Sequence, residues 1–339
     1  MTSFTDCCPG PLRVLTALLL AAAPATGAAQ RAIAIPTGRS DLARADALLR
    51  AGRVDAAEAL YYREVRRRPR DPAARLALGR YLASRGATRV GAVLIEEARF
   101  FGANPALAAI HLAPLYARLG DYKALALLPA APLSASERAR AEWLAKNAPT
   151  LAGPESLTVA MTPPDGDTAT VLGTIDLLID GQSVIAEIDP TVRGLVLDTG
   201  RANRASTRVF TAPPTAVQAG VPGVPAVLAK ARLGALTFTN LPVSLEPLGS
   251  PTRARIGIDL LGRFSPTFHP RDGRLVLRRS GQVSSLLRGE RVPLLLEPRE
   301  AWVVWRGRRE PLAAEPVTRR LRATRWTLDG RRGAIVLQS

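Results

Sequence analysis

The spacing of apolar residues changes once along the 339-residue chain. Between about residues 42 and 128, apolar side chains recur every three or four positions, as they do in amphipathic helices. After Asn147-Ala148-Pro149 the pattern becomes one of short alternating or fully apolar runs separated by glycine and proline, which indicates strands. We therefore predict a multi-domain chain, with a helical region over residues 40–148 followed by an all-β region.

A repeat runs through the helical region. Gly52, Gly86 and Gly120 are 34 residues apart (86−52 and 120−86). Four other columns keep the same offset: Leu42, Leu76 and Ile110; Ala45, Gly79 and Ala113; Leu48, Leu82 and Tyr116; Leu60, Leu94 and Leu128. This period and these residue types resemble tetratricopeptide repeats, which implies antiparallel helix pairs with a glycine at the turn inside each pair.

The array is predicted to end soon after its third repeat. Pro129 interrupts the second helix of that repeat, and Ser134-Ala135-Ser136-Glu137 is a capping box that opens one more helix through Lys146. Two roles remain open for the array: it binds a peptide or protein partner on its concave face, or it is a structural arm that covers the neighbouring domain. His111 follows Ile110, a member of a column expected to be buried, and is itself expected to be a packing or surface residue.

The β region opens with a predicted hairpin. Strands over 174–179 and 183–188 flank Asp180-Gly181, a dipeptide that favours a tight turn. A third strand over 194–197 follows, and further strand-like runs lie between residues 231 and 245. A last hairpin of this region is centred on Arg271-Asp272-Gly273-Arg274.

This order of elements resembles the retropepsin-like aspartic proteases in their secreted bacterial form. That family pairs a hairpin leading into Asp-Thr-Gly with a later Ile-Gly-x-x-Leu-Leu segment, which Ile256-Gly257-Ile258-Asp259-Leu260-Leu261 matches. The resemblance covers about residues 170–280, and we place a β-barrel domain at 157–280. It implies an aspartic endopeptidase without cofactor or metal, active as a homodimer because each half-size domain supplies one aspartate.

Two aspartates compete for the catalytic position. Aspartic proteases need two carboxylates close enough to share one proton, so that one acts as a base and the other as an acid. Asp198-Thr199-Gly200 is the literal motif. Asp189, however, ends the second strand of the predicted hairpin, as the family register requires, although Pro190 and Thr191 replace the threonine and glycine.

The register favours Asp189, and at most one of the two aspartates is catalytic. It predicts that Asp189 lies close to Ile256-Gly257, whereas Asp198 lies beyond the third strand and is more exposed to solvent. In this register the catalytic motif is degenerate, so the sequence leaves open whether the chain is an enzyme.

The tail over 290–339 is predicted to be a β-rich extension. It contains strand-like runs at 292–296 and 302–305 and a hairpin around Asp329-Gly330. These runs add strands to a sheet or form a small β subdomain. They lack a second Asp-Thr-Gly and are too short to be a complete second protease lobe.

The formal net charge of +17 invites a nucleic-acid interpretation. The positive charge is nearly all arginine and is spread over both halves, and the aromatic residues that stack on bases make up only 5% of the chain. We therefore expect no nucleic-acid partner. His111 and His269 lie in different predicted domains, which leaves no Ser-His-Asp or His-based metal site. His269, before Pro270 in a predicted loop, is expected to face solvent.

The N-terminal sequence predicts export. Arg13 precedes an apolar run over 14–23 that is too short to span a bilayer, and small residues up to Ala29 suit signal-peptide cleavage. We place the signal peptide at 1–29, with an uncleaved anchor as the alternative. Cys7 and Cys8 precede the run, so the mature chain would contain neither cysteine nor a transmembrane segment and would be periplasmic or secreted.

Two functions follow from the sequence. The first is an exported, dimeric, retropepsin-like peptidase of the bacterial envelope. The second is a catalytically inactive protease fold that binds a peptide or protein partner through its helical repeats.

Overall fold

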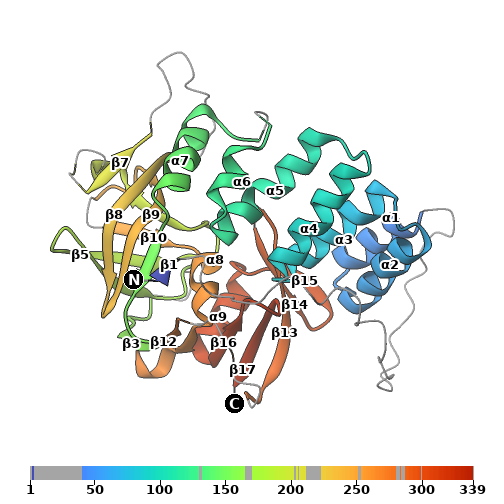
Figure 1. Cartoon of the computed structure of the whole chain (residues 1–339). Coiled ribbons are helices and arrows are strands. Elements are labelled where there is room, and N and C mark those ends of the chain that lie inside the picture. Colours follow the sequence, from blue (N-terminus) through green and yellow to red (C-terminus); the bar gives the residue numbers. More distant parts are fainter. Residues whose placement is uncertain are drawn as a thin grey trace.

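The computed structural model describes residues 2–3, 40–129, 132–164, 170–201, 204, 206–210, 223–250, 253–279, 283, 287–298 and 300–338. Residues 4–39, which hold Cys7, Cys8 and nearly all of the predicted signal peptide, lie outside the described residues. A helical region comes first and a β-barrel with additional strands follows (Figure 1). This arrangement is consistent with a retropepsin-like fold.

Several helices of the helical region begin at a residue whose side chain caps them. It contains α1 (Asp41–Arg50), α2 (Val54–Arg67), α3 (Pro72–Ser84), α4 (Thr88–Phe100), α5 (Pro105–Leu119), α6 (Tyr122–Ala126) and α7 (Ala135–Lys146). The side chains of Ser40, Asp71 and Asn104 accept hydrogen bonds from backbone N–H groups of the first turns of α1, α3 and α5. The predicted capping box of Ser134 and Glu137 opens α7 and is confirmed.

Consecutive helices pack against each other, and the three repeat glycines lie at the turns between α1 and α2, α3 and α4, and α5 and α6. The third repeat departs from the pattern. Leu76 is 8% exposed but Ile110, in the same column, is 50% exposed, so the prediction that Ile110 is buried is wrong. α5 instead buries Ala109 and Leu112, and the five-residue α6 is too short to cover the other side of the helix.

Six strands close into a barrel: β4 (Thr174–Ile179), β5 (Gln182–Ile188), β6 (Leu195–Asp198), β8 (Val224–Leu233), β9 (Leu236–Glu246) and β10 (Arg253–Ile256). Their order around the barrel is β9-β6-β10-β5-β4-β8, and β8 pairs back onto β9. The predicted hairpin of β4 and β5 is confirmed, with Asp180 and Gly181 at positive φ in the turn. Three short strands extend the sheet: β1 (Thr2–Ser3), β2 (Thr150–Ala152) and β7 (Thr207–Val209).

A second sheet joins the extension to the barrel region. Its order is β15 (Arg308–Pro311), β14 (Ala301–Trp305), β13 (Glu290–Leu296), β17 (Ala334–Gln338), β16 (Arg325–Asp329), β11 (Thr267–His269), β12 (Arg274–Arg278) and β3 (Ser156–Ala160). The predicted hairpin over β16 and β17 is present, and β16 pairs with β11. The extension therefore adds strands to a sheet that begins in the barrel region.

The extension also contains a helix that the sequence analysis did not predict, α9 (Glu315–Ala323). Val317 and Leu321, one helical turn apart, are both buried. This burial favours a helix although the segment is short and rich in arginine.

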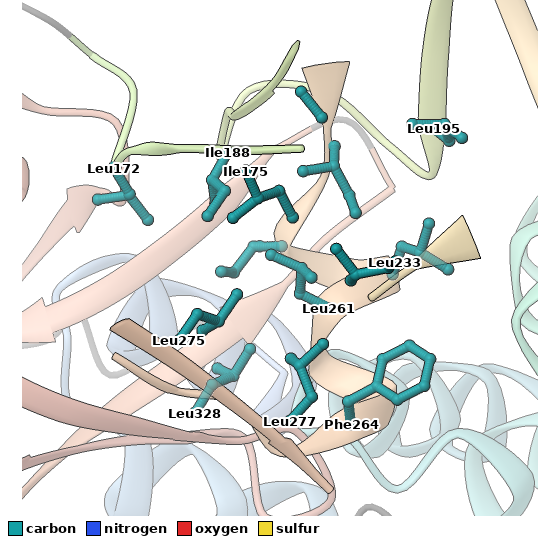
Figure 2. Packing of buried hydrophobic residues seen from close by; sticks show 14 of the residues in the cluster. Leu172, Ile175, Ile188, Leu195, Leu233, Leu261, Phe264, Leu275, Leu277 and Leu328 are labelled. Atoms are coloured by element: carbon teal, nitrogen blue, oxygen red, sulfur yellow. The ribbon is translucent and has the colours of Figure 1, made fainter. Parts of the chain in front are cut away.

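The two sheets share one hydrophobic core (Figure 2). Ile175, Ile188 and Leu233 come from the barrel, whereas Leu275 and Leu328 come from the second sheet. Since one apolar cluster spans both, the extension and the barrel form a continuous β unit.

The helical array is seated on this unit through its interhelix turns. Gly86 has φ +85°, and a Cβ added there would lie 2.0 Å from the carbonyl oxygen of Gly330, so only glycine allows the contact. Nη1 of Arg85 donates to the carbonyls of Leu294, at 3.0 Å, and Gly333. None of the helices in the described ranges is long and apolar enough to cross a membrane.

Candidate functional site

Asp189 lies where β5 meets β10. β10 is inserted between β5, to which it is parallel, and β6, to which it is antiparallel. Ile188 and Ile256 are register partners, and the N–H of Asp189 donates to the carbonyl oxygen of Ile256 at 3.0 Å. The prediction that Asp189 lies beside Ile256-Gly257 is confirmed.

The loop after Asp189 is locked onto the start of α8 (Ile258–Leu261). The N–H of Gly257 donates to the carbonyl of Gly194 at 2.7 Å, and the N–H of Gly194 donates to Oδ1 of Asp259 at 3.0 Å. A Cβ on Gly257 would lie 2.5 Å from both the Val192 carbonyl oxygen and Asp259 Oδ1. Gly257 and Asp259 of the Ile-Gly-x-Asp segment therefore allow the start of α8 to contact the backbone of the loop that follows Asp189.

The Asp189 carboxylate is engaged on both oxygens by its own chain. Oδ1 accepts hydrogen bonds from the N–H of Thr191 at 2.8 Å and from its hydroxyl at 2.6 Å. Oδ2 lies 3.9 Å from Nε of Arg255, whose Nε is also 3.8 Å from Oε2 of Glu187. Only 8% of the Asp189 side chain is exposed. The carboxylate is therefore covered within one chain, and one arginine lies beside both Asp189 and Glu187.

Asp198 has a different, structural environment. It ends β6, and its two oxygens accept from the N–H of Gly200 at 2.8 Å and the N–H of Leu248 at 2.7 Å. These bonds fasten the chain after β9 to the end of β6. The predicted contrast in exposure is absent, because both aspartates are buried: Asp198 is 6% exposed and Asp189 is 5% exposed.

The structure does not bring the two candidate aspartates together. Leu195, at the start of β6, pairs with Ile256 next to Asp189, whereas Asp198 pairs with Glu246 at the other end of the strand. A shared proton requires two carboxylates in direct contact. Within one chain, Asp189 and Asp198 cannot form such a pair.

Arg255 and Glu187 are the site residues that sequence reasoning missed. The available signal was the alternation in β10, where Ala254 and Ile256 are buried and Arg255 points away from them. The alternation does not reveal what Arg255 meets, because its partners come from β5 through a parallel pairing that only the fold establishes.

The histidines do not contribute to this site. His111 is half-buried against the array, and burial, followed by the nearby Arg80, lowers its pKa to about 4. His269 ends β11 with only 14% of its side chain exposed and lies 3.5 Å from Asp272, so the prediction that it faces solvent from a loop is wrong. Pro270 and, from α9, Arg320 line one pocket with it. Among the described residues, no group of three or more His, Cys, Asp and Glu side chains could hold a metal ion.

No protein-family model matches the sequence, and no curated protein matches it. Among solved structures, the chain is similar to a retropepsin-like aspartic protease from Rickettsia conorii, with 18% sequence identity and a TM-score of 0.25. The match covers 38% of this chain and 91% of that chain. At these values, the function of this chain has to be argued from its own residues.

Proposed function

We propose that this chain is a non-catalytic protein of retropepsin-like fold that binds a peptide or protein partner. The observation that carries the proposal is the closed environment of Asp189, whose carboxylate is held by Thr191 and Arg255 and is almost entirely covered.

A dimeric aspartic peptidase would need this carboxylate to be open in the single chain. Its partner carboxylate must approach across a two-fold axis, and the pair must bind water between its oxygens. Here Arg255 lies beside Oδ2, and Thr191 occupies Oδ1. A second carboxylate that approached Oδ2 would meet Arg255, whose side chain is 40% exposed, and Pro190 offers neither a bracing hydroxyl nor an N–H.

The helical array, which we interpret as tetratricopeptide-like, supplies the binding surface in this proposal. Val90, Val93 and Phe100 share one side of α4 by helical spacing, and they are 52%, 49% and 84% exposed. Exposed apolar stripes of this kind favour contact with another chain. Leu296 and Pro298 of the extension line one cavity together with Tyr81 of α3, so this side of the array faces the extension.

Export to the periplasm or beyond is part of the proposal. Its support is the apolar run over 14–23 with the small residues that follow it. Comparing the N-terminal residue of the mature protein with Ala29 by sequencing would test this part separately.

The functional proposal is tested by turnover. Purified wild-type chain is incubated with an unfolded protein substrate between about pH 3 and pH 7, where a carboxylate pair would be singly protonated. Light scattering on the same samples reports the oligomeric state. We expect no cleavage above a substrate blank and no dependence of cleavage on dimerisation.

If cleavage is observed, two variants identify the aspartate that is responsible. Cleavage that is lost in Asp189→Asn and kept in Asp198→Asn would overturn the proposal and establish a peptidase with the Asp189 register. Cleavage lost only in Asp198→Asn would overturn both the proposal and the register.

A further inference from the structure

A cavity of about 250 Å³ lies between the helical array and the barrel and is strongly basic. Four arginines line it: Arg118 from α5, Arg140 from α7, Arg193 from the loop after Asp189, and Arg263 from the segment after α8. They come from four separate segments, so the basic lining is created by the packing of the array on the barrel.

Backbone carbonyls hold the four guanidinium groups in place. The bonds run from Arg118 to Ala83 at 3.5 Å, from Arg140 to Val243 at 2.8 Å, from Arg263 to Ala117 at 3.3 Å, and from Arg193 to Glu297. Each guanidinium group carries five N–H donors, so the one carbonyl bond of Arg118, of Arg140 and of Arg193 leaves donors for other acceptors. Nε and Nη1 of Arg193 are buried, and no residue that the structure describes accepts a hydrogen bond from them.

The positive charge in the cavity is not balanced by its lining. Among the described residues that line the cavity, four arginines face one acidic side chain, Asp259. Glu297 and Glu300 act on Arg193, and Glu137 acts on Arg140, from outside the lining. Asp259 also accepts from the N–H of Gly194. Burial lowers the pKa of Arg118; Asp259 opposes this effect, and Arg193 and Arg263 add to it. Burial likewise lowers the pKa of Arg193, against Asp259, Glu300 and Glu297.

Buried like charges destabilise a fold unless a counter-charge joins them. We propose that this cavity binds a small organic dianion, such as a phosphate monoester or a dicarboxylate. Guanidinium forks match carboxylate and phosphate oxygens bidentately, and a dianion would add negative charge inside the lining, where Asp259 is the one acidic side chain among the described residues. Leu144, Leu195, Leu241 and Pro242 line the remainder, which suits a compact apolar body. The inference does not depend on whether Asp189 is catalytic.

Calorimetric titration of the full wild-type chain tests the proposal. The probes are phenyl phosphate, phthalate and the monoanion benzoate, each measured against sodium chloride at matched ionic strength. We expect saturable binding of one dianion per chain, with benzoate weaker. Phenyl phosphate above phthalate would identify a phosphate site, and the reverse order would identify a dicarboxylate site.

Variants then locate the bound anion. In Arg193→Gln and Arg118→Gln we expect affinity to fall about tenfold or more, because a charge-assisted hydrogen bond is lost in each. Arg193→Lys keeps the charge but not the fork, so it should weaken binding less than glutamine does. Arg89→Gln, on the exposed side of α4, is the matched control and should bind as wild type does.

The thermal unfolding transition of each variant is recorded first, to establish that the variant is folded. If a glutamine variant does not fold, Arg193→Lys replaces it in the binding measurement. The proposal is overturned if no dianion binds more tightly than the chloride control. It is equally overturned if binding is saturable but unchanged in the folded cavity variants.

Discussion

Replacing Gly86 by alanine tests how the helical array is held on the β unit. The backbone at residue 86 has φ +85°, and an alanine there would have to adopt this left-handed conformation, which costs an L-residue about 1–2 kcal/mol. The added Cβ would lie 2.0 Å from the carbonyl oxygen of Gly330, and relieving such an overpacked contact costs about 1–3 kcal/mol. We therefore expect Gly86→Ala to lower the free energy of unfolding by about 2–5 kcal/mol.

Gly102→Ala is the matched control within the same array. Gly102 has φ +103°, but a Cβ there would meet no heavy atom within 4 Å, so only the backbone cost applies. Urea unfolding followed by tryptophan fluorescence should show Gly86→Ala to be less stable than Gly102→Ala by about 1–3 kcal/mol. Limited proteolysis should also cut the array faster in Gly86→Ala. Equal losses in the two variants would refute the close contact between this turn and the extension.

Three further predictions concern stability. Gly257→Ala should destabilise the chain by about 1–3 kcal/mol in urea unfolding, because its Cβ would lie 2.5 Å from Asp259 Oδ1; wild-type stability would show that the loop has room. Burial and, to a smaller extent, Arg80 lower the pKa of His111 in the folded chain to about 4. As the pH falls, the unfolded chain therefore binds a proton on His111 before the folded chain does. Stability should therefore fall as the pH drops from about 6.5 to about 4, and His111→Asn should flatten that slope; an unchanged slope would contradict it. Ser134→Ala should cost about 1 kcal/mol through loss of the capping box, and a helix content and stability equal to wild type would argue against it.

Local patterns in the sequence were sufficient for much of the fold. The β4–β5 hairpin follows from alternation around Asp180-Gly181, and α7 follows from its capping box. Both features depend on residues close together in the sequence. The position of Asp189 beside Ile256 joins distant segments, and it was expected only because the order of elements resembles a known family.

The rest depends on long-range packing. Arg255 meets Asp189 only because β10 inserts beside β5, and Asp198 is covered because Leu248 returns over the end of β6. The sequence analysis missed α9 because its apolar face consists of few residues, among them Val317 and Leu321, and their burial becomes clear only in the folded chain.

The net charge of +17 gave no hint of where a basic site would form. The cavity arginines come from α5, α7, the loop after Asp189 and the segment after α8, and no sequence motif links them. Such clusters become visible only when the packing of separate segments is known.

The free energy of unfolding of Asp189→Asn tests most directly whether this carboxylate holds the loop together or is kept for reaction. Asparagine has nearly the same shape, but it loses the charge that strengthens the bonds from Thr191 and attracts Arg255. We expect a loss of about 1–2 kcal/mol, whereas Asp176→Asn on the exposed side of β4 should change stability by less than about 0.5 kcal/mol. An Asp189→Asn chain as stable as wild type, or more stable, would contradict the account, because replacing a carboxylate that is strained for catalysis relieves strain.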